Sequence, residues 1–339
     1  MAQATGTHSR YDLNAAGDNV KRDLSEVITM IDPTDTPLQS MIASESSGST
    51  VKEWPMDSLA AASTSNAHID GDVFSGDTLT APVILQNHHQ IFRKDLIVTR
   101  RAQTVRQAGT KNELSRQIVK AGKELKRDIE ATITNNQAVT VGDDSTAPKL
   151  AGLPAWLKTN TDRGATGTDP TLSGTTYGYP NAAAGNGTNR AVSEATLLGI
   201  VKDVYVQGGS PEVLMMGPAM KQKFSQFQFS SSARIATPYQ DHGKSPKGGL
   251  TVNGAVDIYV TDFGTLEIVV NRFQSEEDIY VLEKDKLSLS YITKYEIDNQ
   301  HKDGDADRRM LVSDVTLCVK DEAALGIHAD SDSTTAVVA

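Results

Sequence analysis

The clearest pattern of apolar and polar positions in the chain lies between Thr110 and about Asn136. Residues Thr110-Lys111-Asn112-Glu113 have the form of a capping box, which marks the start of a helix. The pattern predicts one amphipathic helix about 40 Å long, with a charged face left for solvent or a partner. Its apolar stripe has the three- and four-residue spacing of a helix face and consists of Leu114, Ile118, Ala121, Leu125, Ile129 and Ile133.

Upstream of this helix the pattern predicts extended structure. Val51 to Trp54 and Val83 to Val98 have strand-like sequences, and the polar stretch between them, Leu59 to Thr80, has too little apolar surface to form a core. We therefore expect a long two-stranded flap that projects from the body. Two short amphipathic sets, Leu24 to Ile31 and Leu38 to Ile42, precede the flap and predict an arm with two small helical anchors.

Downstream of the helix, residues 139–192 are rich in Gly, Thr, Asn and Ala and predict a surface insertion anchored at Leu150 to Leu157. From Ser193 the pattern becomes mixed α/β. A helix carrying Leu197 and Val204 is expected to stop at Gly208-Gly209, because glycine adopts the left-handed geometry of a helix end. A helix is predicted to start at Pro218. Val256 to Val270 predicts a hairpin that buries Val256, Ile258 and Val260. Further strands are predicted at Glu212 to Met216, Ile279 to Leu282, Leu287 to Ile292 and Met310 to Val319.

Composition narrows the class of protein. The 339 residues are 38% hydrophobic and only 5% aromatic, so we expect a fold with large extended segments or one that contacts with neighbouring copies stabilise. We expect neither secretion nor a membrane span, because the first residues lack an apolar signal core and no run of about 18 apolar residues occurs. The single cysteine, Cys318, excludes internal disulfides and is expected to pack as a small apolar residue.

Charge is distributed unevenly along the chain. The total is −10, which argues against a general nucleic-acid binder. The segment from Arg93 to Arg127, however, contains eleven Lys or Arg residues and three acidic residues, which gives it a local net charge of +8. Oppositely charged surfaces on one chain suit contacts between copies.

The motifs in the sequence that resemble known sites do not support catalysis, a metal or a cofactor. Asp262-Phe263-Gly264 lacks the other kinase motifs and predicts a turn. Asp303 to Asp307 with Asp314 resembles a calcium loop, but Arg308 stands where such a loop needs glycine. His88 and His89 would point to opposite faces of a strand.

Two further motifs lack the residues that catalysis would need. Ser210, in Gly208-Gly209-Ser210-Pro211-Glu212, lacks the final glycine of a nucleophile elbow. Glu124 and Asp128 lie among Lys and Arg residues, which favours a solvated or intersubunit ion network over an acid/base pair.

The order of elements and a set of short motifs resemble the major capsid proteins of tailed bacteriophages with the Hong Kong 97-like fold, an α+β fold, and more narrowly the SU10-like branch. The resemblance runs from about residue 20 to 328. Its motifs are Ile31 to Pro37, Glu53-Trp54, Asp57 to Ala60, Asn87, Gln90-Ile91, Glu124 to Glu130, Gly208 to Pro211, Asp262-Phe263-Gly264, Val270-Asn271-Arg272, Gly304-Asp305, Thr316-Leu317 and Glu322 to Gly326.

This resemblance implies a domain organisation and a function. The implied segments are an N-terminal arm (1–46), an extended loop hairpin (47–105), the spine helix of a peripheral domain (106–138), an insertion (139–192), an axial domain (193–275), strands returning to the peripheral domain (276–328) and a tail (329–339). The implied function is a structural one, the self-assembly of hexamers and pentamers into an icosahedral shell that encloses the genome in the virion. The implied partners are other copies, a separate scaffolding protein, a portal, decoration proteins and weakly held double-stranded DNA, with assembly in the host cytoplasm.

From the charge pattern we expect the acidic flap tip to dock on a neighbour's basic segment, and the charged helix face to contact other copies. The expected interface residues are Asp70, Asp72, Asp77, Arg93, Lys94, Arg100, Arg101, Lys123, Glu124, Lys126 and Arg127. Two alternatives stay open at this point. One is the shell of an encapsulin nanocompartment, which shares the fold but encloses an enzyme cargo, and the other is a soluble α/β ligand-binding protein or enzyme.

Overall fold

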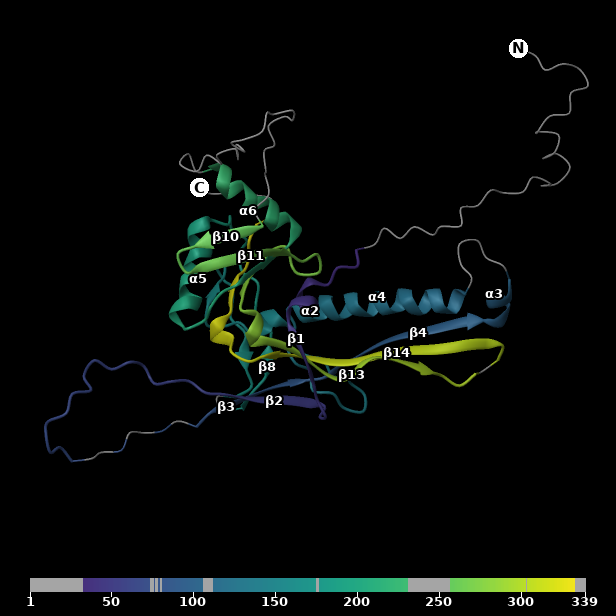
Figure 1. The fold of residues 1–339 in the computed structure, drawn as a ribbon, viewed down its shortest axis with the longest axis horizontal. Helices are drawn as coiled ribbons and strands as arrows, with labels where there is room; N and C mark the ends of the chain where they lie inside the picture. The colour runs from purple at the N-terminus through teal and green to yellow at the C-terminus, as the bar shows by residue number, and fades with distance from the viewer. Residues whose placement is uncertain are drawn as a thin grey trace, which may run out of the picture.

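The computed structural model describes residues 33–332 apart from 74, 75, 77, 78, 80, 106–111, 175, 176, 231–256 and 303. The molecule is elongated, and its long axis follows the helix α4 (Glu113–Thr134) and the strands beside it (Figure 1). This four-stranded sheet has the order β1 (Ala43–Ser46), β13 (Leu287–Asn299), β14 (Ala306–Val319), β4 (Gln90–Thr99). The short helices α2 (Pro37–Met41) and α3 (Arg100–Thr104) lie near the two ends of α4.

A six-stranded sheet forms the second part of the body. Its order is β10 (Ile258–Thr261), β11 (Gly264–Val270), β9 (Val213–Met216), β12 (Ile279–Leu282), β15 (Gly326–His328), β5 (Thr161–Asp162). The helices α5 (Glu194–Val206) and α6 (Pro218–Ser230) lie beside it (Figure 1). The central strands β9 and β12 are buried along their whole length.

The two faces of these central strands contribute side chains to two different hydrophobic cores. Val213 and Met215 of β9 belong to the larger core, which also includes the C-terminal half of α4 and the long sheet. Leu214 and Met216 of the same strand belong to the smaller core under α5 and α6. Because neighbouring residues on a strand point to opposite faces, one strand serves both cores.

The flap begins as a ladder between β2 (Val51–Met56) and β3 (Val83–His88), and the parallel strand β7 (Tyr177–Gly178) extends this sheet. The segment 57–82 between β2 and β3, here called the flap loop, projects beyond the body (Figure 1). The remaining regular elements are β6 (Thr171–Leu172), β8 (Pro180–Ala182) and the 3-10 helices η1 (Leu153–Ala155), η2 (Lys284–Lys286) and η3 (Glu322–Ala324).

The structure confirms the predicted helices and strands with three corrections in the first half of the chain. The long helix begins one residue after Asn112, whose side chain accepts a hydrogen bond from the Ser115 N–H, so Glu113 is its first residue and not the third residue of a capping box. The predicted return limb of the flap divides at His89: β3 pairs with β2, whereas β4 pairs with β14 of the body. The insertion 139–192 is also less of a surface loop than expected, because β5 joins the six-stranded sheet and β7 extends the flap sheet.

The fourth correction concerns which face of β10 is buried. Val260 and Ile258 are exposed, and Tyr259 is the residue that faces the core, whereas Val256 lies outside the described residues. The tyrosine ring packs edge-on against Phe224 at 5.2 Å, and its hydroxyl donates to Glu194. These partners come from two helices that are distant in sequence, and they outweigh the aliphatic alternation of the strand itself. The arm anchor at Leu24 to Ile31 also lies outside the described residues.

Candidate assembly surfaces

The flap loop exposes apolar side chains that the subunit does not cover. Leu59 is 99% exposed, Leu79 91%, Val73 85% and Ile69 79%. Single exposed apolar residues are common on protein surfaces, but four in one projecting segment make that segment a candidate for burial against another molecule. From the sequence this stretch was expected to be polar, with too little apolar surface to form a core, and its predicted docking rested on the acidic residues of the tip alone.

The acidic residues of the tip are accessible where they are described. Asp70 is exposed, and the carboxylate of Asp72 lies 3.1 Å from Nδ1 of His68. The predicted third member, Asp77, lies outside the described residues. The loop therefore presents at least two carboxylates beside its apolar side chains.

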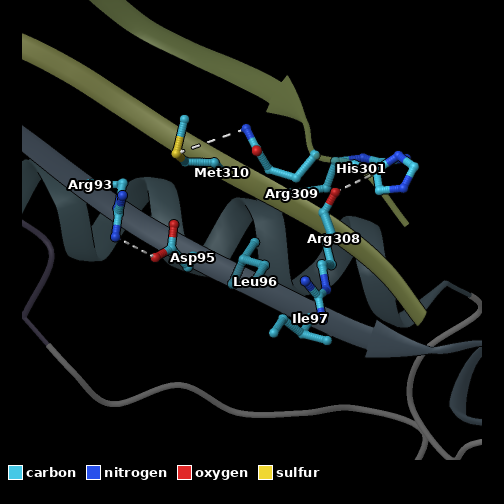
Figure 2. Close-up of a pocket in the computed structure, with 9 residues that line it drawn as sticks. Arg93, Asp95, Leu96, Ile97, His301, Arg308, Arg309 and Met310 are labelled. Carbon is cyan, nitrogen blue, oxygen red and sulfur yellow. Dashed lines mark hydrogen bonds and ion pairs between the residues drawn. The ribbon is translucent and has the colours of Figure 1, made fainter. Parts of the chain in front are cut away.

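The predicted basic segment divides between the two faces of the long sheet. Lys94 points towards α4, where its ammonium lies 2.6 Å from the carboxylate of Asp128 and ties β4 to the helix. Arg93 projects from the opposite face, 3.1 Å from Asp95 (Figure 2). Arg100 pairs with Asp305 at 3.0 Å, and Arg101 is exposed on α3. Lys94 thus holds the subunit together, whereas the three arginines are accessible.

Arg93 lines a groove that the sequence analysis did not identify. This β4–β14 groove has a volume of about 540 Å³ and lies at the end of the long sheet (Figure 2). Strand pairing brings Arg309 opposite Leu96 and Arg308 opposite Ile97, so two further cations join Arg93 there. The doublet Arg308-Arg309, directly before the predicted strand Met310 to Val319, was the sequence signal for it. The lining residues are Arg93, Asp95, Leu96, Ile97, Gln300, His301, Arg308, Arg309 and Met310.

The predicted residues on α4 do not form one cluster. Lys126 lies 5.6 Å from the centroid of the Tyr295 ring, and Arg127 lies 5.7 Å from that of Phe273, which are cation–π distances. Glu124 pairs with Lys120 within the helix at 3.7 Å. Lys123 borders an apolar pocket of about 390 Å³ between α4 and the strands β13 and β14.

The motifs weighed for chemistry occupy structural positions. Gly264 of the Asp262-Phe263-Gly264 turn has φ +146°, which explains the glycine. In the calcium-like segment, Asp305 pairs with Arg100 and Asp307 pairs with Lys302. In the described ranges, no group of three or more His, Cys, Asp or Glu residues is arranged to hold a metal ion.

The side chains of His89 and Cys318 are both buried. Burial lowers the pKa of His89, whose Nδ1 lies 3.2 Å from the Thr50 carbonyl oxygen. Cys318 is buried in the larger core, as predicted, and burial raises the pKa of its thiol to about 12. Among the helices that the structure describes, none is long and apolar enough to cross a membrane.

An elongated body, a projecting loop with uncovered apolar residues and separated charged surfaces are features of structural subunits that associate with copies of themselves. Comparison with known proteins supports this class. The family model for the SU10 major capsid protein matches residues 3–332. The chain therefore belongs to the SU10 major capsid protein family of tailed-phage shell proteins, which is a structural family and not an enzyme family.

Individual relatives agree with the family match. The major capsid protein of Escherichia phage Phieco32 is 25% identical over 343 residues, which cover 94% of this chain and 95% of the relative. The capsid of a native GTA particle has a TM-score of 0.64 at 10% identity, covering 96% of this chain and 100% of that chain. The holo-SrpI encapsulin complex from Synechococcus elongatus PCC 7942 has a TM-score of 0.55 at 10% identity and covers 98% and 99%.

These findings confirm the predicted resemblance and the α+β, Hong Kong 97-like fold. The encapsulin likeness concerns the fold alone, because encapsulins and phage capsid proteins share it. The family match places this chain with the phage shell proteins, and it excludes the ligand-binding and enzymatic alternatives that the sequence analysis left open.

Proposed function

We propose that copies of this chain form rings of six and five that tile an icosahedral shell around packaged double-stranded DNA. The observation that carries this proposal is the family match over residues 3–332, combined with a flap loop whose apolar residues are exposed in the single subunit. Head-to-tail contacts around a rotation axis close into rings. Because each subunit touches several others at once, modest pairwise affinities combine into a stable lattice.

The parts of the subunit take the following roles in this proposal. Residues 1–46 are the arm, 47–105 the extended loop hairpin, 106–138 the spine helix and 193–275 the axial domain. The strands of 276–328 return to the peripheral domain, while 139–192 is an insertion and 329–339 a tail. The exposed flap loop lies over an adjacent subunit, which covers the side chains of Leu59, Val73 and Leu79.

The flap tip docks electrostatically in this arrangement. Asp70 and Asp72 of one copy face Arg93, Arg100 and Arg101 of a neighbour, with Arg308 and Arg309 of the β4–β14 groove adding to the positive surface. Complementary charge contributes mainly to the rate and the specificity of association, and apolar burial contributes the affinity. Lys94 is left out of this docking surface because it is half-buried and points towards α4, where Asp128 binds it.

We infer the remaining partners from the class of protein. A separate scaffolding protein guides assembly in the host cytoplasm, and a portal and decoration proteins join the shell. Outside the basic segment 93–127, the chain carries a net charge of −18, since the whole has −10 and the segment +8. This negative charge keeps DNA contact weak and lets the genome be packed and released.

Charge reversal with rescue tests the docking surface. The double variant Arg93→Glu, Arg101→Glu is expected to give soluble subunits but few shells in sedimentation and electron microscopy. Adding Asp70→Lys and Asp72→Lys restores the complementary charge and should recover shells. The matched control is Lys149→Glu, Lys202→Glu, which reverses two exposed cations outside the segment and should assemble normally.

Normal shell yield from the first variant, or no recovery on charge exchange, would contradict the docking surface. The wider proposal has its own measurement: the wild-type protein should sediment as particles far larger than one subunit, with nucleic acid rather than an enzyme cargo inside particles from infected cells. A wild-type chain that stays monomeric at high concentration together with its scaffolding protein would defeat it.

A further inference from the structure

A buried carboxylate lies where three separated parts of the chain meet. Glu130 is on α4 and is completely inaccessible, yet its carboxylate forms no salt bridge with any described residue. A buried carboxylate without a cation is costly unless hydrogen bonds compensate it. Burial raises the pKa of Glu130, and the hydrogen bonds that it accepts oppose that shift.

Four hydrogen bonds from two other segments satisfy this carboxylate. Oε1 accepts from the backbone N–H of Leu38 at 2.8 Å and from Nδ2 of Asn271 at 2.7 Å. Oε2 accepts from the backbone N–H of Gln39 and from its Nε2, both at 3.1 Å. The donors are 92, 91 and 141 residues away in sequence. Leu38, Gln39, Glu130 and Asn271 are here called the arm joint.

The arm joint gives a physical role to three of the sequence motifs that carry the family resemblance. Ile31 to Pro37 leads directly into α2, Glu124 to Glu130 ends on the buried carboxylate, and Val270-Asn271-Arg272 supplies the amide. These motifs are far apart in the sequence, and the fold brings Asn271 and Leu38, the residue after Pro37, within hydrogen-bonding distance of the Glu130 carboxylate.

Surrounding contacts hold each partner of the carboxylate in place. Nε2 of Gln39 also donates to the Lys126 carbonyl oxygen at 2.7 Å, and the Tyr295 hydroxyl donates to Oε1 of Gln39 at 3.1 Å. The Asn271 N–H donates to the Met216 carbonyl oxygen, so the amide that reaches Glu130 is anchored on the six-stranded sheet. The helix, the sheet and the root of the arm are therefore coupled.

The helix at the root of the arm depends on this support. α2 has five residues, too few to be stable in isolation, and the backbone N–H groups at its start have no partners within the helix. Glu130 accepts hydrogen bonds from two of those N–H groups, and the side chain of Leu38 is completely buried. Without the carboxylate, buried donors of Leu38 and Asn271 would be left unsatisfied.

We propose that Glu130 is a positioning residue that fixes the root of the amino-terminal arm, residues 33–42, to the spine helix and the six-stranded sheet, so that this root keeps one orientation in every subunit. The consequence for shells rests on the proposed function, because a fixed direction matters where the arm meets a neighbouring copy. The attachment itself is a property of the single subunit and can be measured there.

Hydrogen exchange and assembly of the full-length chain test this proposal together. In Glu130→Ala, exchange in peptides covering residues 33–42 should rise on the order of 10- to 100-fold, while peptides of the six-stranded sheet keep their protection. Shell yield should fall to a small fraction of that of the wild type. The matched control for the exchange measurement is Glu124→Ala, which removes an accessible carboxylate from the same helix and should leave exchange at 33–42 unchanged.

A second variant keeps the test decisive if Glu130→Ala fails to fold. Gln39→Ala removes one donor to Glu130 and the contact with Tyr295 from a half-buried position, and it should raise exchange at 33–42 and lower shell yield by a smaller factor. Unchanged exchange at 33–42 in every folded variant would overturn the proposal. If the wild type forms no shells, the proposed function fails, but the exchange measurement still decides whether Glu130 holds the arm.

Discussion

The two halves of α4 carry the same apolar stripe but differ in what covers it. In the C-terminal half, Leu125, Ile129 and Ile133 are completely buried. In the N-terminal half, Leu114 and Ile118 are only half-buried, and the neighbouring Val119 is 61% exposed beside the open pocket of about 390 Å³. Helical periodicity thus predicts that a face is apolar, but not whether the same chain covers it. The subunit encloses one half of the helix and leaves the other accessible to a partner.

The largest expected effect on stability distinguishes the two halves of α4 directly. Ile129→Ala should lower the free energy of unfolding of the subunit by about 2–5 kcal/mol, because it leaves a cavity in a fully packed core. Val119→Ala, on the open half of the same helix, should change it by no more than about 0.5 kcal/mol. Urea denaturation of unassembled subunits measures both. Equal effects would mean that the open half is buried in solution.

A second effect on stability, of up to about 3 kcal/mol, comes from Asp278, a half-buried acid beside the buried strand β12. Burial raises the pKa of Asp278 to about 6, and the negative charges of Asp330 and Glu277 act in the same direction. Arg163 and a hydrogen bond from the Tyr280 hydroxyl at 3.3 Å act in the opposite direction. The folded state therefore favours the protonated carboxyl.

The sign of the pH dependence follows from this shift. The favourable contribution of Asp278 is fully present below the pKa of about 3.8 that it has in the unfolded chain, and it is lost as the pH rises through about 6. Asp278→Asn keeps an acceptor for Tyr280 and removes the charge. It should be more stable than the wild type at pH 8 and equally stable at pH 4, as measured by thermal unfolding. A variant that is less stable at pH 8 would show that the carboxylate is needed in its charged form.

The same contrast explains which features could be predicted from the sequence. The helix α4, the β2–β3 ladder and the buried Leu150 to Leu157 segment follow from local periodicity, and the structure confirms them. The buried face of β10 does not, because Tyr259 turns inward to partners on α5 and α6. Glu130 also escaped prediction, since a carboxylate beside an apolar stripe resembles any other charged helix residue until α2 and Asn271 are placed against it.

The candidate interface residues show the limits of charge counting. Lys94 belongs to the basic segment by composition, but the fold turns it towards Asp128 of its own chain. Conversely, Arg308 and Arg309 lie more than 200 residues from Arg93 and join it only because β14 pairs with β4. Local sequence gives the sign and amount of charge, whereas long-range strand pairing decides which charges share a surface.

The smallest effect on the stability of the subunit is expected in the flap loop, where the apolar side chains are exposed. Replacing Leu59, Val73 and Leu79 with Ser removes side chains that are 85–99% exposed, so the free energy of unfolding should change by no more than about 0.5 kcal/mol for each substitution. Shell yield should nevertheless fall sharply, because each lost side chain would otherwise contribute roughly 1.5–3 kcal/mol on burial against a neighbour. A matched variant, with Ser58 and Ser63 changed to Ala in the same loop, should assemble normally. Thermal unfolding of subunits and sedimentation of shells give the two measurements, and a subunit destabilised by several kcal/mol would show that the loop packs on its own body instead.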